Sequence, residues 1–178
     1  MSKKTFAFDI DGVICETQNG DYKNSVPNMK SIKKINDLHA EGNKCKIFFP
    51  KDVKVGKNLN DKSVEKEFAD IEDEDMILDV GPKTLVEIKK VIDNSSTILW
   101  NGPLGYFENE NFSFGSSEVA NYIANKGDKI FSVVGGGDTV ALINSINIKS
   151  KFNFVSTAGG AFLEFLEGKN LPGIKALC

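Results

Sequence analysis

The chain has 178 residues, of which 40% are hydrophobic and 26% are charged, and its formal net charge is -3. This composition is typical of one globular domain without a strongly basic surface, so we expect neither nucleic acid nor a membrane as a partner. Its apolar runs are too short for a transmembrane helix. Three cysteines without metal-ligand spacing predict reduced thiols and a cytoplasmic location: Cys15, Cys45 and Cys178.

Short apolar runs alternate with amphipathic segments along the chain, which predicts strand–helix repeats on a parallel sheet. The expected fold class is α/β, a single three-layer Rossmann-like domain with about five to six strands. The predicted strands are Thr5–Ile10, Cys45–Phe49, Thr97–Trp100, Lys129–Val134 and Phe152–Ser156. The predicted helices are Asn28–Glu41, Pro82–Ile92, Ser116–Asn125, Thr139–Ser145 and Gly160–Leu166. The acidic segment Glu65–Asp79 is expected to be a solvent-exposed connection that contains a short strand.

Four predicted strands end in polar or glycine-rich sequences, which read DIDG, WNGP, GGGD and STAGG. The carboxyl ends of parallel strands lie at one edge of a sheet, where the following helices present free amide groups. We therefore expect the functional residues at this edge.

The sequence Gly135-Gly136-Gly137 follows a predicted strand and precedes a predicted helix. Glycines let the backbone approach a ligand closely, and the first amides of a helix favour negative charge, so this turn suits a phosphate group. Asp138 could hold Mg²⁺, which prefers one or two carboxylates together with phosphate oxygens. A tight turn that requires a positive φ explains the same glycines without a ligand, and that alternative stays open.

Four motifs together resemble the C-terminal, nucleotide-binding domain of phosphoglycerate kinase, over about residues 45–178. They are DVGPKT (79–84), TILWNGPLGYFE (97–108), VVGGGDTVA (133–141) and STAGGA (156–161). In the last motif, Ala158 stands where the family has glycine. The segment KIFFPKDVKV (46–55) also looks like the strand that precedes the first motif in this family.

The resemblance implies ADP or ATP as the ligand and Mg²⁺ as the cofactor. It implies contacts to the terminal phosphates and the magnesium ion from Gly135, Gly136, Gly137, Asp138 and Thr139. It further implies a nucleotide pocket lined by Asn101, Gly102 and Pro103, with Glu108 near the ribose hydroxyls.

Kinase turnover is not expected from this chain. Phosphoryl transfer depends on cationic groups that neutralise the charge of the transition state. The family takes these from a lysine in a Gly-Gly-Ala-Lys-Val segment and from arginines of a separate N-terminal domain. This sequence lacks that segment and contains no arginine. Whether the chain is an enzyme therefore stays open.

The segment FAFDIDGVICET (6–17) and the helix after it resemble the start of the haloacid dehalogenase superfamily of Mg²⁺-dependent phosphatases, over about residues 1–44. Residues two apart in an extended chain point to the same side, so two carboxylates at this spacing can reach one phosphate and one metal. The resemblance implies that Asp9 is a nucleophile, that Asp11 is the general acid and base, and that both help to hold Mg²⁺. A polar turn explains the same residues without chemistry.

The later motifs of that superfamily are missing. Its second strand ends in serine or threonine, whereas here the strand ends in Phe48-Phe49-Pro50, and no acidic pair stands at a later strand end. Lys51 and Lys83 are only positional candidates for its lysine. Asp138 or Asn101 could substitute in the metal site by geometry.

The two segments, 1–44 and 45–178, are expected to form one compact domain. Its sheet order would be 2-1-3-4-5 in the order of the predicted strands, with Thr5–Ile10 between Cys45–Phe49 and Thr97–Trp100. We carry three functional hypotheses: a Mg²⁺-dependent ADP or ATP binding domain, a minimal phosphatase acting on a phosphate ester, and a fused or chimeric chain without specific activity. An exposed sheet edge would also favour self-association.

Overall fold

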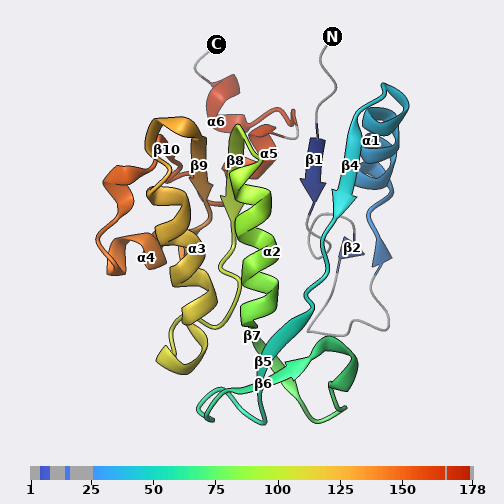
Figure 1. Ribbon diagram of the computed structural model, residues 1–178. Helices are drawn as coiled ribbons and strands as arrows, with labels where there is room; N and C mark the ends of the chain where they lie inside the picture. Colours follow the sequence, from blue (N-terminus) through green and yellow to red (C-terminus); the bar gives the residue numbers. More distant parts are fainter. Residues whose placement is uncertain (1–4, 9–14, 17–25, 167, 177–178) are drawn as a thin grey trace. The chain divides into compact units, whose positions relative to one another are not determined.

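The computed structural model of the protein describes residues 5–8, 15–16, 26–166 and 168–176 (Figure 1). The chain divides into two compact units, Met1–Phe49 and Pro50–Cys178. Parallel strands and helices alternate in the chain, which confirms the predicted α/β class. The expectation that the two segments form one compact domain stays a prediction.

The first unit contains a strand–helix–strand repeat with parallel strands. Its elements are β1 (Thr5–Phe8), β2 (Cys15–Glu16), β3 (Val26–Pro27), α1 (Met29–Ala40) and β4 (Lys44–Ile47). Strand β1 pairs with β4 in parallel, and β2 pairs with β3 in antiparallel orientation. Helix α1 begins where Asn28 Oδ1 accepts a hydrogen bond from the Ser31 N–H group, and it ends before Gly42, whose φ is 85°. This cap and this glycine explain why the sequence pattern located the helix within one residue.

The second unit begins with an antiparallel sheet that the sequence pattern did not predict. Its strands are β5 (Asp52–Gly56), β6 (Val64–Glu67) and β7 (Met76–Val80), in the order β6-β5-β7. Val53 and Val55 of the central strand are buried. The strand β5 was not predicted because its alternation of apolar residues is short and lies among the charged residues Lys51, Asp52 and Lys54. The other two strands were not predicted because Glu65–Asp79 is dominated by acidic residues.

The acidic segment is therefore more than a solvent-exposed connection. It contributes the end of β6, a 3₁₀ turn at Phe68–Asp70 and nearly all of β7. The Asp75 carboxylate is only 2% exposed and accepts hydrogen bonds from Lys66 Nζ at 2.7 Å and from the Glu72 N–H group at 2.9 Å. Lys57 Nζ lies 3.3 Å from its other oxygen. These contacts hold the β6–β7 connection against β5.

We expect the ion pairs of Asp75 to make the stability of this unit depend on acidic pH. The hydrogen bond from Lys66, followed by that from Glu72, lowers the pKa of Asp75 from 3.8 to about 2. A carboxyl whose pKa is lower in the folded state stabilises the fold above its unfolded pKa. This contribution is lost as pH falls from 3.8 to about 2.

Urea unfolding at several pH values tests this expectation. The change Asp75→Asn should flatten the dependence of the unfolding midpoint on pH in the acidic range. The control Asp73→Asn replaces an exposed carboxylate of the same segment and should leave that dependence as it is. Equal slopes for Asp75→Asn and the unchanged protein would contradict the assignment.

Two buried carboxylates join the antiparallel sheet to the helices. Asp52 accepts hydrogen bonds from the N–H groups of Lys83 and Thr84 at 2.9 and 2.7 Å, and thereby caps α2 (Pro82–Asp93). Asp79 accepts from the Gly115 N–H group at 2.8 Å, at the start of α3 (Phe114–Ala124). Burial raises the pKa of the Asp79 carboxyl, against the effect of its hydrogen bonds from Gly115 and Val80. Both carboxylates are structural groups.

The remainder of the second unit is a parallel sheet with helices. Its strands are β8 (Thr97–Asn101), β9 (Phe131–Gly135) and β10 (Phe154–Val155), in the order β10-β9-β8. The other helices are α4 (Gly137–Ser145), α5 (Gly160–Leu166) and α6 (Pro172–Lys175), and 3₁₀ turns lie at Glu110–Phe112, Gly127–Lys129 and Lys149–Lys151. The neighbours expected within each sheet are confirmed, since β1 pairs with β4 and β9 lies between β8 and β10. The described strand pairs do not include β1 with β8, so the continuous order 2-1-3-4-5 stays a prediction.

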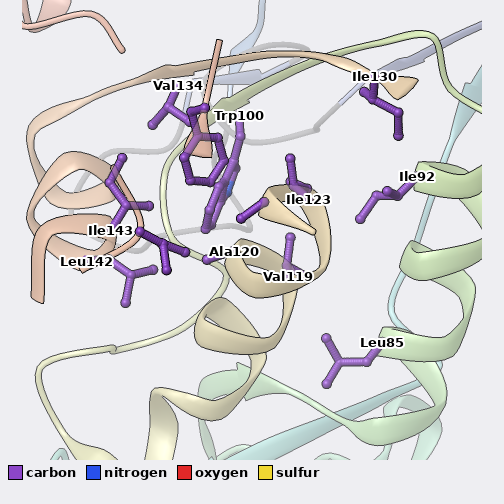
Figure 2. Close-up of a cluster of buried hydrophobic side chains, with 13 residues drawn as sticks. Leu85, Ile92, Trp100, Val119, Ala120, Ile123, Ile130, Val134, Leu142 and Ile143 are labelled. Atoms are coloured by element: carbon purple, nitrogen blue, oxygen red, sulfur yellow. The ribbon is translucent and has the colours of Figure 1, made fainter. Parts of the chain in front are cut away.

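The main core lies on one face of this parallel sheet. Figure 2 shows Trp100 and Val134 of the sheet beside Ala120 of α3 and Ile143 of α4. Leu85 and Ile92 extend the same cluster along α2 (Figure 2). Burial of these side chains supplies the hydrophobic free energy that holds α2, α3 and α4 to the sheet.

The opposite face of the parallel sheet is more open. Side chains alternate between the two faces of a strand, so Leu99, Asn101 and Gly135 lie on the face away from Trp100. Leu99 is 49% exposed, and Phe131 and Phe154 on the neighbouring strands are 53% and 51% exposed.

Among the residues that the structure describes, no helix is long and apolar enough to cross a membrane.

Candidate functional site

The ends of β8 and β9 bring two of the predicted motifs side by side. Asn101, the last residue of β8, is in register with Gly135, the last residue of β9. Beyond them, the Gly102 N–H group donates to Thr139 Oγ1 at 2.7 Å, and the Trp100 indole N–H group donates to the Gly102 carbonyl at 2.7 Å. The buried Thr139 hydroxyl thus ties the end of β8 to the first turn of α4.

The turn between β9 and α4 leaves the first amides of the helix without a side-chain cap. Gly136 precedes the helix with φ at 86°, a conformation that favours glycine, and has no side chain to cap the helix. The amides of the first helical turn carry the positive end of the helix dipole and need a partner. A Cβ atom placed on Gly137 would meet nothing within 4 Å, so its surroundings are open to a ligand.

The side chains of Asn101 and Phe162 lie close to Gly135 and Gly136. A Cβ atom on Gly136 would lie 3.0 Å from Asn101 Oδ1. A Cβ atom on Gly135 would lie 2.6 Å from Cδ1 of Phe162 and 3.2 Å from Asn101 Oδ1. Gly135 is therefore required by close packing, whereas Gly136 is required by its positive φ.

The only carboxylate in the first turn of α4 is that of Asp138, and it is exposed. No group of three or more histidine, cysteine, aspartate or glutamate residues that could hold a metal lies within the described ranges. A site made of protein ligands alone is therefore not formed there. One carboxylate beside an anion site does suit Mg²⁺, because this ion takes most of its ligands from phosphate and water.

The loop after β8 carries the other predicted nucleotide-binding residues. Gly102 and Pro103 lie next to the turn, but the chain then runs over the start of α3, where the N–H groups of Leu104 and Gly105 donate to Ser116 Oγ. Further along, the Tyr106 N–H group donates to the Leu78 carbonyl and Asn109 Nδ2 donates to the Leu59 carbonyl. Glu108 is exposed in this loop, and no hydrogen bond or ion pair of the described residues connects it to the glycine turn.

The predicted carboxylate pair, Asp9 and Asp11, lies outside the described residues. The two positional lysines belong to the second unit and are engaged in ion pairs. Lys51 Nζ lies 3.4 Å from the Glu87 carboxylate, and Lys83 is paired with Glu67. Both pairs are largely exposed, so they are screened by solvent.

Sequence reasoning missed one side chain at the turn, that of Phe162. It lies in the first turn of α5, after STAGG, and contacts Gly135 from a position 27 residues further along the chain. The sequence does show a large aromatic residue directly after the glycine-rich segment STAGGA. Its contact could not be predicted, because it depends on how α5 packs on the sheet.

Comparison with known proteins gives one consistent result. The family model for phosphoglycerate kinase matches residues 9–169. The phosphoglycerate kinase of Francisella philomiragia is 49% identical over 130 residues, which cover 72% of this chain and 33% of the relative. That of Maricaulis maris is 45% identical over 142 residues, which cover 78% of this chain and 35% of the relative. The chain thus spans about a third of the length of the curated relatives that it matches.

Solved structures agree with the sequence matches. Phosphoglycerate kinase from Coxiella burnetii superposes with a TM-score of 0.70 at 39% identity, over 83% of this chain and 37% of that chain. The enzyme from Pyrococcus horikoshii OT3 gives a TM-score of 0.63 at 30% identity, over 84% of this chain and 36% of that chain.

The family match begins at residue 9 rather than near residue 45, where we expected the resemblance to begin. It therefore includes most of the segment that resembles the haloacid dehalogenase superfamily. The comparisons give that second resemblance no support.

Proposed function

Because the chain belongs to the phosphoglycerate kinase family, we propose that its glycine turn binds ADP or ATP together with Mg²⁺, without kinase turnover by this chain alone. The observation that carries this proposal is the uncapped start of α4, which lies beside Asn101 and is tied to β8 by the bond from Gly102 to Thr139. A helix start in this setting binds phosphate through its amide groups.

Each residue of the proposed site has a separate task. The amides of Gly137, Asp138 and Thr139 would bind the terminal phosphates, and Asn101 and Pro103 would border the nucleoside. Magnesium would neutralise phosphate charge, and Asp138 would supply its protein ligand. For Glu108 to contact the ribose, its side chain would have to reach the nucleotide from a loop that the described contacts hold to β7 and Leu59.

We expect no turnover because of the charge that develops in the transition state. Transfer of a phosphoryl group requires cations around the moving group. The sequence contains no arginine. We therefore expect the site to bind a nucleotide with Mg²⁺ without the further cations that phosphoryl transfer requires.

Titration with ADP in the presence of Mg²⁺ tests the proposal. Trp100 is the only tryptophan of the chain, and its indole binds the Gly102 carbonyl beside the turn, so its fluorescence should report binding. We expect Asp138→Asn to weaken the binding of ADP with Mg²⁺ about tenfold, equivalent to 1.4 kcal/mol. Its effect should vanish when Mg²⁺ is removed, because the lost interaction is with the metal.

The matched control is Asp128→Asn, which replaces an exposed carboxylate in the turn before β9. It should leave the affinity unchanged. If the two variants bind equally, Asp138 is not the metal ligand. If the unchanged protein shows no binding at millimolar ADP, the nucleotide proposal is wrong and the hypothesis of a chain without specific activity is favoured.

A phosphatase that uses Asp9 and Asp11 is the second candidate. One observation favours it: β1 is a parallel strand, and its described residues Thr5–Phe8 directly precede Asp9 in the sequence. Release of phosphate from p-nitrophenyl phosphate, compared between the unchanged protein and Asp9→Asn, distinguishes the two. Equal rates would mean that this carboxylate pair has no catalytic role.

We also propose a cytoplasmic location and self-association through a sheet edge. Strand β10 lies at the end of the parallel sheet among the described strand pairs and also in the expected continuous order, and unpaired strand edges favour association.

A further inference from the structure

The pair Asn101-Gly102 places a side-chain amide next to an accessible backbone nitrogen. Glycine has no Cβ atom, so no side chain shields its nitrogen from the Cγ atom of the asparagine before it. Asn101 is exposed, and a Cβ atom placed on Gly102 would meet nothing within 4 Å. Water can therefore reach the reacting groups, and an asparagine in this setting is chemically labile.

The fold holds the two reacting groups apart. Asn101 is the last residue of β8, in register with Gly135, so its backbone is extended. The Gly102 N–H group donates to Thr139 Oγ1 at 2.7 Å, and the Gly102 carbonyl accepts from the Trp100 indole at 2.7 Å. Thr139 is fully buried, so water does not compete for its hydroxyl group. The Gly102 nitrogen can reach Cγ of Asn101 only when the backbone between them rotates, which breaks the bond to Thr139.

We infer that Asn101 is a site of spontaneous deamidation, and that the hydrogen bond from Gly102 to Thr139 limits its rate in the folded protein. In this reaction the Gly102 nitrogen gives its proton to hydroxide and forms a bond to Cγ of Asn101. The C–N bond of the side chain breaks, and ammonia leaves with a proton from water. Water then opens the succinimide ring at either carbonyl, which gives aspartate or isoaspartate. Water is consumed as ammonia is released, and nothing is oxidised or reduced.

The rate of this reaction should report how often the end of β8 opens. Parts of a folded protein open locally at a lower free energy than global unfolding requires. The bond from Gly102 to Thr139 must break in each such opening. The loss of one hydrogen bond changes an opening equilibrium by about fivefold. The hydroxyl group of Thr139 should therefore have a measurable effect on the chemistry of Asn101.

Incubation at mildly alkaline pH, followed by chromatography and mass spectrometry of the peptide that contains Asn101, tests this inference. We expect the folded protein to form aspartate and isoaspartate there more slowly than the protein in concentrated urea, by about tenfold or more. Thr139→Val, which removes the hydroxyl group, should accelerate the reaction of the folded protein about fivefold. Thr139→Ser, which keeps the hydroxyl group, should react like the unchanged protein. In urea all three should react equally.

The matched control is Ser116→Ala. Ser116 Oγ accepts from the N–H groups of Leu104 and Gly105, further along the same loop, so its loss should leave the Asn101 rate unchanged. Equal acceleration by Ser116→Ala and Thr139→Val would indicate a general loosening of the loop and would overturn the inference.

A comparison of the unchanged protein with itself decides the question if Thr139→Val does not fold, which circular dichroism would reveal. Equal rates at Asn101 in buffer and in urea would mean that the fold gives no protection, and the inference would be wrong. It would also be wrong if Asn101 stayed intact in urea while Asn19, which also precedes glycine, was converted. The measurement uses no nucleotide, so its outcome does not depend on the proposed function.

Discussion

Alanine in place of Phe112 will lower the free energy of unfolding of the second unit by about 4 kcal/mol. The Phe112 side chain is fully buried in the 3₁₀ turn before α3. Its Cζ atom lies 3.1 Å from the position that a Cβ atom of Gly56 would take, so the ring packs on the end of β5. Its removal leaves a cavity beside the end of β5, and large-to-small changes at such fully buried sites cost both the lost burial and the cavity.

Urea unfolding with circular dichroism measures this loss. Phe68→Ala is the matched control, because Phe68 is 47% exposed in a similar 3₁₀ turn, and its loss should be below about 1 kcal/mol. Similar losses for the two variants would mean that Phe112 is not a core residue. The dependence of the free energy on urea should stay the same in both, since the surface exposed on unfolding hardly changes.

The second large effect is expected from Asp52→Ala, at about 3 kcal/mol. The change removes the acceptor of the Lys83 and Thr84 N–H groups, while the Thr84 hydroxyl keeps the Asp52 backbone carbonyl as its acceptor at 2.7 Å. These donors lie at the start of α2, where a buried unpaired N–H group is costly. Burial opposes ionisation of Asp52, but the hydrogen bonds from Lys83 and Thr84 prevail and lower its pKa. Its contribution is therefore present at neutral pH and is lost as pH falls through the folded pKa.

A double-mutant cycle with Gly81 makes this prediction specific. A Cβ atom on Gly81 would lie 2.3 Å from Cγ of Asp52, so Gly81→Ala must displace the cap. In the Asp52→Ala background this clash is absent. The cost of Gly81→Ala should therefore be smaller there by more than about 1 kcal/mol, in the range of coupling expected between residues in contact. Additive effects would show that Asp52 and Gly81 are not packed together.

These two changes affect parts of the fold away from the glycine turn. Asp138 is exposed, and its side chain forms no hydrogen bond or ion pair with the described residues, so its replacement should leave the free energy of unfolding nearly unchanged. Stability and nucleotide binding can thus be measured independently in the same set of variants.

The helices and the parallel strands were predicted from the sequence to within a few residues. Gly160–Leu166 agrees in full, and Pro82–Asp93 extends one residue beyond the prediction. The strands have shorter or shifted ends, as at Phe154–Val155, because strand ends depend on the neighbouring strand. The antiparallel sheet was missed because Val53 and Val55 alternate with charged residues over only a few positions.

The glycine turn was also predictable, because the conformation of a turn depends mainly on residues that are consecutive in the sequence. A strand, three glycines and a helix start are enough to present amides to an anion, and the positive φ of Gly136 agrees with the glycine there. The role of the DVGPKT segment was not predictable. It carries Asp79 and Thr84, which hold elements together through contacts with Gly115 and Asp52.

By itself, the sequence determined the α/β class, the family and the location of the turn between β9 and α4, because periodicity and motif residues are properties of consecutive positions. The tertiary structure decided what surrounds that turn. Thr139 binds the backbone of Gly102 from 37 residues away, and Phe162 takes the space beside Gly135. Such contacts depend on the packing of α4 and α5 against the sheet, and no local pattern of residues encodes that packing.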